Sequence, residues 1–302
     1  MVMSLKLERS ALNPLFGPNP QHLWESRYVF NPAVVYDGSV FHMLYRAQGA
    51  DMVSRMGYAV SLDGLHFNRM EKPVFSPAVK EELYGVEDPR ITKIGNKYYM
   101  TYTAYSPEDI KIALASTDNF FRWKRYGIIL PNFDPNKDAV LFPEKIVGKY
   151  VMLHRDPPSI WIAYSDDLIH WNGHKKIADP IKNHWENEKI GAGGPPVKTP
   201  YGWLLVYHAV QKHAPEPSRL TYRLGFMLLD LKDPSKVIKR TSEPVLEPKE
   251  EWEIFGGVPQ VVFTDALIDY QDQYLIYYGA ADNYIALASC PKQKVFDWIN
   301  ES

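Results

Sequence analysis

Short runs of β-branched, aromatic and aliphatic residues recur along the chain in pairs, and turn residues separate the two members of each pair. Five such pairs occupy residues 30–47, 87–105, 138–156, 193–210 and 258–282. The turns carry hairpin chemistry, as in Asp37-Gly38 and Gly95-Asn96. No stretch has the periodicity of a long amphipathic helix, although the terminal VFDWINES suits a short one. The pattern therefore predicts an all-β protein built from repeated hairpins.

A third β-rich run follows each hairpin, and a short segment marked by proline closes four of the five units. These closing segments are KPVFSP, GIILPN, DPIKN and EPVLEP. The fifth unit has no such segment after Cys290, but NPLFGPN at residues 13–19 has the same character. We therefore expect a ring whose last sheet is completed by the N-terminal segment.

The length of the repeat indicates a propeller built from four-stranded blades. The units start near residues 31, 88, 139, 195 and 259. These starts lie roughly 51 to 64 residues apart, which is close to the length of one four-stranded blade. Five blades make a five-bladed β-propeller, and we predict one such domain over residues 1–302. A β-sandwich, or two barrels with accidental similarity, is the alternative.

Composition and charge exclude several classes of function. The 302 residues carry a net charge of -2, without the basic excess of a nucleic-acid or membrane-surface protein. The one cysteine leaves no disulfide framework and no Cys-based zinc site, and the histidines lack a metal-binding spacing such as HExxH. The N-terminus has no apolar signal-peptide core, and no apolar run approaches the ~18 residues of a transmembrane helix. We expect a cytoplasmic protein without a metal.

Polar residues gather where a propeller would bring strand ends together. In antiparallel pairs, the starts of first strands and the ends of second strands lie at the same mouth of the central channel. The residues at these positions are Asn31, Arg46, Asp88, Tyr105, Lys137, Asp138, His154, Arg155, His208 and Asp282. A lone aspartate before proline is more often a turn residue. Polar groups repeatedly aimed at one mouth, however, are costly to desolvate unless they bind something.

The two sides of this mouth differ in charge. The first two blades supply Asn31, Arg46 and Asp88. The third and fourth supply Lys137, Arg155, Lys189 and His208, with Tyr222 nearby. Such a group of cations in a slightly negative protein indicates an anion site, and Arg and Lys together suit phosphate. The glycine-rich residues 191–194 predict a flexible loop that lets backbone approach a ligand, although the spacing is not that of a P-loop.

Two carboxylates are adjacent in the stretch YGVEDPRI, at Glu87 and Asp88. Pro89 disfavours the α region for the residue before it and predicts an extended Asp88. Strand alternation would turn Glu87 and Asp88 to opposite faces, so that one of them faces the pocket. Arg90 would share the face of Asp88 at a deeper level, as a partner inside the channel.

Motifs spread over all five units resemble those of glycoside hydrolase family 130. The matching segments are FNPAVV, YRA, EDPRI, KDAVLFPEKI, LHR, WENEKIGAGGPP, GWLLVYH, YRLGFMLLDL and YYGAAD. Together they span roughly Asn13 to Cys290. Members of this family are mostly inverting mannoside phosphorylases, with a minority of hydrolases. The resemblance implies a five-bladed propeller, in agreement with the repeats.

The resemblance also implies a role for each residue of the mouth. Asp88 would be the catalytic acid, acting through the 3-hydroxyl of the sugar, and inorganic phosphate would be a co-substrate with no further cofactor. Phosphate would be bound by Lys137, Arg155, Lys189, His208 and Tyr222. The sugar would be bound by Asn31, Arg46, Glu87, Asp138 and Asp282. An inverting hydrolase needs an acid and a base, whereas phosphate is already an anion and needs only to be neutralised and aimed.

We therefore expect an inverting phosphorylase that cleaves β-mannosides and releases α-mannose 1-phosphate, a glycosyltransferase-type transfer of a hexosyl unit to phosphate. The expected substrates are β-1,4-manno-oligosaccharides, with β-1,2-mannan and mannosyl-N-acetylglucosamine as alternatives. A hydrolase with Asp138, Glu144 or Asp282 as base, and a non-catalytic sugar-binding propeller, also stay open. Loops 49–56, 106–110 and 211–220 are expected to form the acceptor subsite. The expected partners are small carbohydrates and phosphate, neither nucleic acid nor membrane, and homo-oligomer formation stays open.

Overall fold

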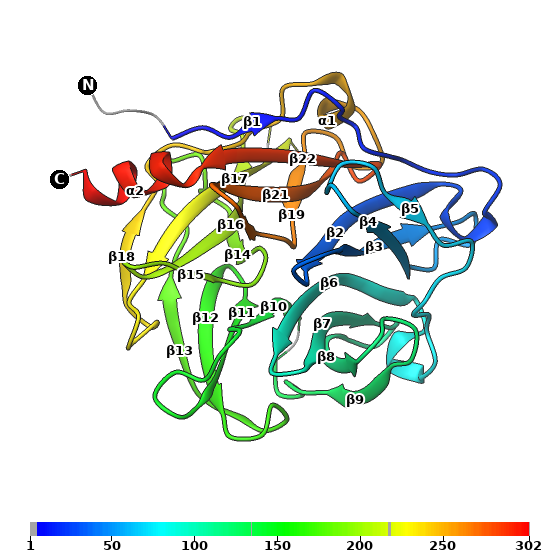
Figure 1. Cartoon of the computed structure of the whole chain (residues 1–302), viewed down its shortest axis with the longest axis horizontal. Helices are drawn as coiled ribbons and strands as arrows, with labels where there is room; N and C mark the ends of the chain where they lie inside the picture. The colour runs from blue at the N-terminus through cyan, green and yellow to red at the C-terminus, as the bar shows by residue number, and fades with distance from the viewer. Residues whose placement is uncertain (1–4, 134, 217–218, 302) are drawn as a thin grey trace.

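The strands of this protein form five antiparallel sheets around a common centre (Figure 1). The computed structural model describes residues 5–133, 135–216 and 219–301. We call the sheets blades 1 to 5 in chain order. The prediction of an all-β, five-bladed propeller is confirmed.

Each blade begins with its innermost strand and proceeds outwards. Blade 1 consists of β2 (Tyr28–Tyr36), β3 (Phe41–Gln48), β4 (Arg55–Ser61) and β5 (Asn68–Arg69). Blade 2 consists of β6 (Gly85–Ile94), β7 (Lys97–Tyr105), β8 (Ile110–Thr117) and β9 (Lys124–Ile128). Blade 3 consists of β10 (Lys137–Leu141), β11 (Tyr150–Asp156), β12 (Ser159–Ser165) and β13 (Trp171–Ala178).

The last two blades are less regular at the centre. Blade 4 consists of β14 (Lys189–Ala192), β16 (Trp203–Lys212), β17 (Leu220–Leu229) and β18 (Val237–Arg240), and β15 (Val197–Lys198) also pairs with β16. Blade 5 consists of β19 (Val262–Thr264), β21 (Gln273–Ala280), β22 (Tyr284–Pro291) and β1 (Glu8–Arg9), and β20 (Ile268–Tyr270) also pairs with β21.

The N-terminal segment completes blade 5, as the sequence predicted. In the ladder between β1 and β22, Glu8 lies opposite Ser289. The segment predicted for this role, residues 13–19, also follows β22, but it makes a single bridge between Phe16 and Ile285. Pro14 and Pro18 have no N–H to give to a ladder, which accounts for the interrupted pairing there.

The centre of blade 4 differs from the prediction. A flexible loop was expected at residues 191–194, but Gly191 and Ala192 belong to β14 and pair with β16. A Cβ atom at Gly191 would lie 2.4 Å from Oδ2 of Asp138 and 2.6 Å from Nε2 of His208. Glycine is therefore required here because two site residues pack directly against the strand. The innermost strands of the other four blades, by contrast, begin within about three residues of the predicted starts.

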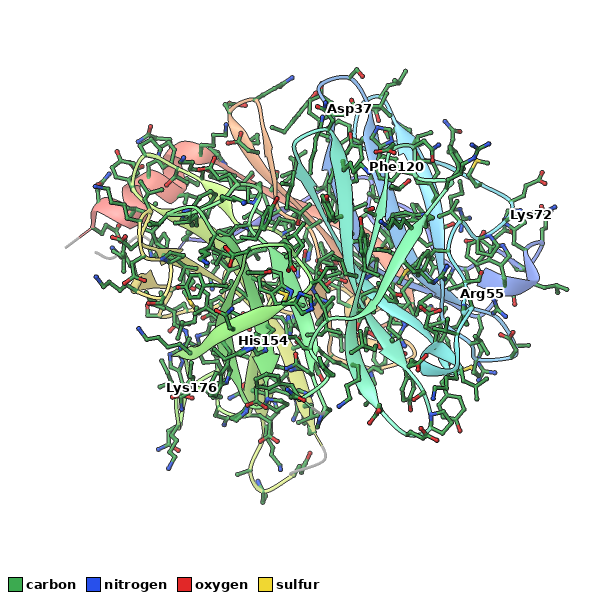
Figure 2. All side chains as sticks on the ribbon, turned by 90° about the horizontal axis from the view of Figure 1, so that it is seen from below. Asp37, Arg55, Lys72, Phe120, His154 and Lys176 are labelled. Carbon is green, nitrogen blue, oxygen red and sulfur yellow. The ribbon has the colours of Figure 1, made fainter. Side chains whose placement is uncertain are left out.

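Most strands are buried on both faces, because each blade packs against two neighbours. On β16, Leu204 and Val206 pack in a cluster with strands of blade 5, whereas Leu205 packs in a cluster with strands of blade 3. Side chains fill the space between the blades (Figure 2), and Phe120 of blade 2 stacks on His42 of blade 1 at 4.5 Å between ring centroids. This double burial explains the continuous hydrophobic runs of the sequence.

Helices are short and lie at the periphery. They are η1 (Leu23–Glu25), η2 (Lys80–Glu82), α1 (Glu251–Ile254) and α2 (Lys292–Asn300). The predicted C-terminal helix is thus present as α2, beside β22 (Figure 1), and its Val295 and Trp298 pack into the core shared by blades 4 and 5. Within the described part of the chain, no helix has the length and apolarity needed to span a bilayer.

Candidate active site

The innermost strands of blades 1, 2 and 3 each carry one residue with a left-handed backbone. These residues are Asn31 (φ 48°), Asp88 (φ 48°) and Asp138 (φ 58°). At each of them the pairing register with the next strand shifts, which marks a β-bulge. Non-glycine residues in this region cost on the order of 1–3 kcal/mol each, and such strain is retained mainly at functional sites. The same distortion in three blades therefore indicates a common site at this end of the channel.

The bulge in blade 2 overturns two predictions about YGVEDPRI. Asp88 is left-handed rather than extended. Glu87 and Asp88 lie on the same side, because both contact Arg46: Oε1 of Glu87 is 2.5 Å from Nη2, and Oδ1 of Asp88 is 3.0 Å from Nη1. The bulge breaks the alternation that would have separated the two carboxylates. Arg90 lies deeper, as predicted, and donates from Nη1 to the carbonyl oxygen of Asp88 at 3.0 Å.

Asp88 is buried and tightly held. Its Oδ1 accepts hydrogen bonds from Nδ2 of Asn31 at 2.8 Å and from Arg46. Burial alone would raise the pKa of Asp88, but the charges of Arg46, Lys137 and Arg90 lower it to about 2. Without a ligand the carboxyl group of Asp88 is therefore ionised at neutral pH.

Glu87 lies between two cations. Arg46 binds its Oε1, and Nζ of Lys137 donates to its Oε2 at 3.1 Å. Arg46 in turn donates from Nε to Oγ of Ser54 at 2.9 Å and lies over the ring of Phe30. Burial lowers the pKa of Arg46, but Glu87 and Asp88 outweigh it and raise the pKa above its ordinary value. Arg46 is thus a fixed cation that orients both carboxylates.

A third carboxyl group, that of Asp282, faces the same cation from blade 5. It follows β21 in a left-handed turn, with φ 51°. Burial raises the pKa of Asp282 to about 7; Arg46 opposes this rise, whereas Asp88 and Glu87 add to it. We call Glu87, Asp88 and Asp282 the acidic wall. Asp282 therefore holds its proton to a much higher pH than an ordinary aspartic acid does.

The opposite side of the mouth is basic. Nη1 of Arg155, on β11, lies 2.7 Å from Oδ2 of Asp138, and Nε2 of His208, on β16, lies 3.2 Å from the same oxygen. Burial lowers the pKa of His208, although Asp138 opposes the change, so the imidazole is neutral at pH 7. Its ring packs on Phe263 at 4.3 Å. We call Arg155, Lys189 and His208 the basic wall.

Lys189, the first residue of β14, lies among other cations. Burial lowers the pKa of Lys189, and the charges of Arg155 and Lys137 lower it further. Its Nζ lies 5.7 Å from the ring centroid of Tyr222, whose own pKa is raised by burial. A cluster of cations that depress each other's pKa is unfavourable unless an anion joins it. The basic wall is therefore a candidate anion site.

The residues assigned to acid catalysis, phosphate binding and sugar binding lie in or directly beneath this mouth, but two have unexpected partners. Lys137 was assigned to phosphate, and its ammonium group binds Glu87 of the acidic wall. Asp138 was assigned to sugar binding, but its carboxylate is 2% exposed and contacts Arg90, Arg155 and His208.

His154 was expected at the mouth and lies elsewhere. It lies in blade 3 (Figure 2), where its Nδ1 accepts from Nδ2 of Asn136 and its Nε2 lies 3.1 Å from Nδ1 of His174. Burial and, to a smaller extent, the neighbouring His174 together lower the pKa of His154 to about 3. His154 thus belongs to a neutral, buried cluster rather than to the site.

Ser54 and Asp265 were missed from the sequence. Ser54 lies in no recognisable motif, and the one signal for Asp265 was a carboxylate inside the apolar run VVFTDALI.

Among the residues that the structure describes, no group of three or more His, Cys, Asp or Glu side chains is arranged to hold a metal ion.

Comparison with known proteins identifies the relatives of this chain. The family model Glyco_hydro_130, described as beta-1,4-mannooligosaccharide phosphorylase, matches residues 6–301. Two proteins of Thermoanaerobacter sp. (strain X514) are each 48% identical. They are a 1,2-beta-oligomannan phosphorylase, with 94% of this chain and 97% of that protein aligned, and a beta-1,2-mannobiose phosphorylase, with 96% and 99% aligned.

A solved structure shows the same architecture. The beta-1,2-mannobiose phosphorylase from Listeria innocua, in complex with beta-1,2-mannobiose, superimposes with a TM-score of 0.87 at 29% sequence identity, over 97% of this chain and 99% of that one. The family match spans nearly the whole chain and all five blades, and the relatives align at close to full length. This chain belongs to glycoside hydrolase family 130.

Proposed function

We propose that this protein is an inverting β-mannoside phosphorylase whose substrates are β-1,2-linked manno-oligosaccharides. The observation that carries the proposal is the arrangement of one hydrogen-bonded acid, Asp88, opposite a basic wall with excess positive charge. Among the described residues Lys189 forms no close ion pair with a carboxylate; Arg155 and Lys137 repel its charge, whereas Asp138 and Glu188 attract it from a longer distance. Inorganic phosphate has the charge and the size to offset these cations, so it serves as the nucleophile without a general base.

The two walls divide the reaction between them. The basic wall, with Tyr222, holds phosphate so that one of its oxygens attacks the anomeric carbon and forms the new C–O bond. The glycosidic C–O bond breaks on the opposite face, and its electron pair passes to the leaving oxygen. Asp88 supplies the proton for that oxygen, through the 3-hydroxyl group of the sugar as the family implies. Attack from the face opposite the leaving group inverts the configuration, and the mannosyl unit leaves as α-mannose 1-phosphate.

The remaining site residues bind and orient the mannosyl unit. Asn31 and Arg46 fix Asp88 through hydrogen bonds to its Oδ1. Burial raises the pKa of Asp282, and a protonated carboxyl group can both donate to and accept from sugar hydroxyls. Lys137, bound to Glu87, lies between the walls and assists phosphate from the acidic side.

The linkage in this proposal differs from the β-1,4 linkage that the sequence suggested. The Thermoanaerobacter relatives, each 48% identical over almost their whole length, act on β-1,2 linkages. The description of the family model names a β-1,4 reaction, but that description covers a broad family. Similarity at this level and coverage favours β-1,2-mannosides, with mannobiose and longer oligomers both in range.

Hydrolysis is disfavoured by the positions of two proposed bases. Asp138 contacts Arg90, Arg155 and His208, and burial leaves it no route to a water molecule at the mouth. Glu144 follows β10 at the end remote from Lys137, and it binds Nζ of Lys198 at 2.6 Å. Asp282 is the remaining candidate base. If it activated water, sugar would be released without phosphate, so the phosphate dependence of the reaction tests this role.

The test is incubation of the purified protein with β-1,2-mannobiose, β-1,2-mannotriose and β-1,4-mannobiose, each with and without inorganic phosphate. Phosphorus NMR follows the formation of mannose 1-phosphate and reports its anomeric configuration. We expect turnover of the β-1,2 substrates only in the presence of phosphate. Equal sugar release without phosphate would mean hydrolysis, and faster turnover of β-1,4-mannobiose would refute the proposed linkage.

A further inference from the structure

Arg90 lies beneath the mouth and joins four of the five blades. It comes from β6 of blade 2, where it donates to the carbonyl oxygen of Asp88, and its side chain is 1% exposed. Nε donates to the carbonyl oxygen of Gly193 at 3.3 Å, in blade 4. Nη2 lies 3.0 Å from Oδ1 of Asp138 and 2.8 Å from Oδ1 of Asp265, in blades 3 and 5. One guanidinium group therefore fixes the relative positions of the catalytic acid and of both carboxylates.

Asp138 connects Arg90 to the basic wall. Its Oδ1 binds Arg90, and its Oδ2 contacts both Arg155 and His208. Three positively charged or polar groups around one carboxylate outweigh its burial and hold the pKa of Asp138 well below its usual range. Asp138 is thus a permanent anion that sets the positions of the two basic side chains closest to it.

Asp265 has no part in the mechanism described above, and it is fully buried. Arg90 is its one close ionic partner among the described residues, and neither of its oxygens accepts a well-aligned hydrogen bond. Burying a carboxyl group without full compensation costs several kcal/mol, so an apolar side chain would be the more stable choice if only packing mattered. The retained acid therefore calls for a functional explanation.

The pKa values of the two carboxyl groups on Arg90 are shifted in opposite directions. Burial raises the pKa of Asp265 well above its usual range; Arg90 and Arg46 oppose the rise, whereas Asp88 and Asp138 add to it. Asp265 is therefore the weaker counter-ion of the two, and Asp138 is the stronger one.

We propose that Asp138 and Asp265 are positioning residues for phosphate: both act through Arg90 from beneath the site, and neither touches the ligand. This inference rests on the proposed function, since it takes inorganic phosphate as the anion of the basic wall. It also replaces the sugar-binding role that the sequence suggested for Asp138. Asp138 orders Arg155 and His208 as an anion, and Asp265 holds the far side of Arg90 through its contact with Nη2.

The experiment compares the parent protein with the variants Asp265→Asn, Asp265→Leu and Asp138→Asn. Titration calorimetry with inorganic phosphate measures the anion site directly, and steady-state kinetics give separate KM values for phosphate and for β-1,2-mannobiose. Asp269→Asn is the matched control, because Asp269 is a half-exposed carboxylate of the same blade whose partner is Lys292. Melting curves verify that each variant is folded.

We expect Asp265→Asn to bind phosphate within about threefold of the parent, because it keeps a neutral polar group against Arg90. Asp265→Leu should weaken phosphate binding about tenfold or more, a loss of about 1.4 kcal/mol, with the KM for mannobiose unchanged. Asp138→Asn should do the same, which keeps the test decisive if the leucine variant does not fold.

Three results would overturn the inference. One is unchanged phosphate binding in folded Asp265→Leu or Asp138→Asn. Another is an equal loss of affinity for phosphate and mannobiose, and the third is a loss confined to mannobiose. If the parent itself binds no phosphate by calorimetry, the proposed function fails first, and the two failures are thereby distinguished.

Discussion

The Oδ1 atom of Asp88 lies 3.0 Å from Nη1 of Arg46, and this contact keeps the acid of the site ionised in the absence of ligand. A general acid must carry its proton when the bond to the leaving group breaks. Bound phosphate brings negative charge to the same mouth and offsets Lys137 and Arg46. We therefore expect Asp88 to acquire its proton only when phosphate is bound, which couples acid catalysis to the arrival of the nucleophile.

Replacing Asp88 with asparagine removes the proton donor and keeps the shape of the side chain. We expect kcat for phosphorolysis of β-1,2-mannobiose to fall by about 10²–10⁴, the usual contribution of general acid catalysis. The KM values should change far less. A mannoside with an activated leaving group, such as 4-nitrophenyl β-mannoside, should lose less activity because it needs less protonation. An equal loss for both substrates would argue against the acid role of Asp88.

Replacing Lys189 with alanine relieves repulsion in the free protein but removes a cation from the basic wall. We expect the KM for phosphate to rise about tenfold or more, while the KM for the mannoside stays within about threefold. Lys182→Ala is the control, because Lys182 is an exposed lysine just ahead of the same strand. A KM for phosphate that does not respond to Lys189→Ala would remove this residue from the anion site.

The raised pKa of Asp282 links the stability of the fold to pH. The pKa rises from 3.8 to about 7 on folding, so the buried proton stabilises the protein below about pH 4, and this contribution is lost as pH rises through about 7. The parent should therefore lose stability relative to Asp282→Asn over that range, by on the order of 2–4 kcal/mol. Urea denaturation of both proteins at about pH 5 and pH 8 measures the difference. A constant difference between the two would show that Asp282 titrates normally.

For the buried pair His154 and His174 we expect the opposite pH dependence, with stability lost as the pH falls. Burial lowers the pKa of His154 from 6.5 to about 3, so the neutral form is favoured in the fold, and its contribution to stability is lost as pH falls from about 6.5 towards 3. The variant His154→Gln should therefore lose less stability than the parent between about pH 7 and pH 4.5. Melting curves at the two pH values test this, with Asp88→Asn as a control for other acid-sensitive groups. Identical losses in parent and variant would contradict the buried cluster as the cause.

The fold and the gathering of polar residues at one mouth could be predicted because both follow from local signals and from topology. Hydrophobic runs with hairpin turns define the blades, and strand ends such as Asn31 and His208 must meet at one mouth once the ring is closed. These arguments need no knowledge of side-chain packing.

The internal arrangement of the site could not be predicted in the same way. A β-bulge depends on how a strand pairs with its neighbour, so nothing in YGVEDPRI revealed that Glu87 and Asp88 would share one guanidinium group. Asp265 lies in an apolar run from another blade, and its contact with Arg90 exists only in three dimensions. The contacts of Lys137 and Asp138 likewise depend on side-chain geometry across blades.

The pairing of β1 with β22 has a consequence for the order of events during biosynthesis. Residues 8 and 289 lie opposite each other in this ladder, so the ribosome must make almost the whole chain before blade 5 can be completed. Asp265 and Asp282 belong to that blade, so the mouth stays incomplete until this part of the chain has been made. Contacts between the earlier blades can form sooner, but blade 5 closes only after Ser289 has left the ribosome.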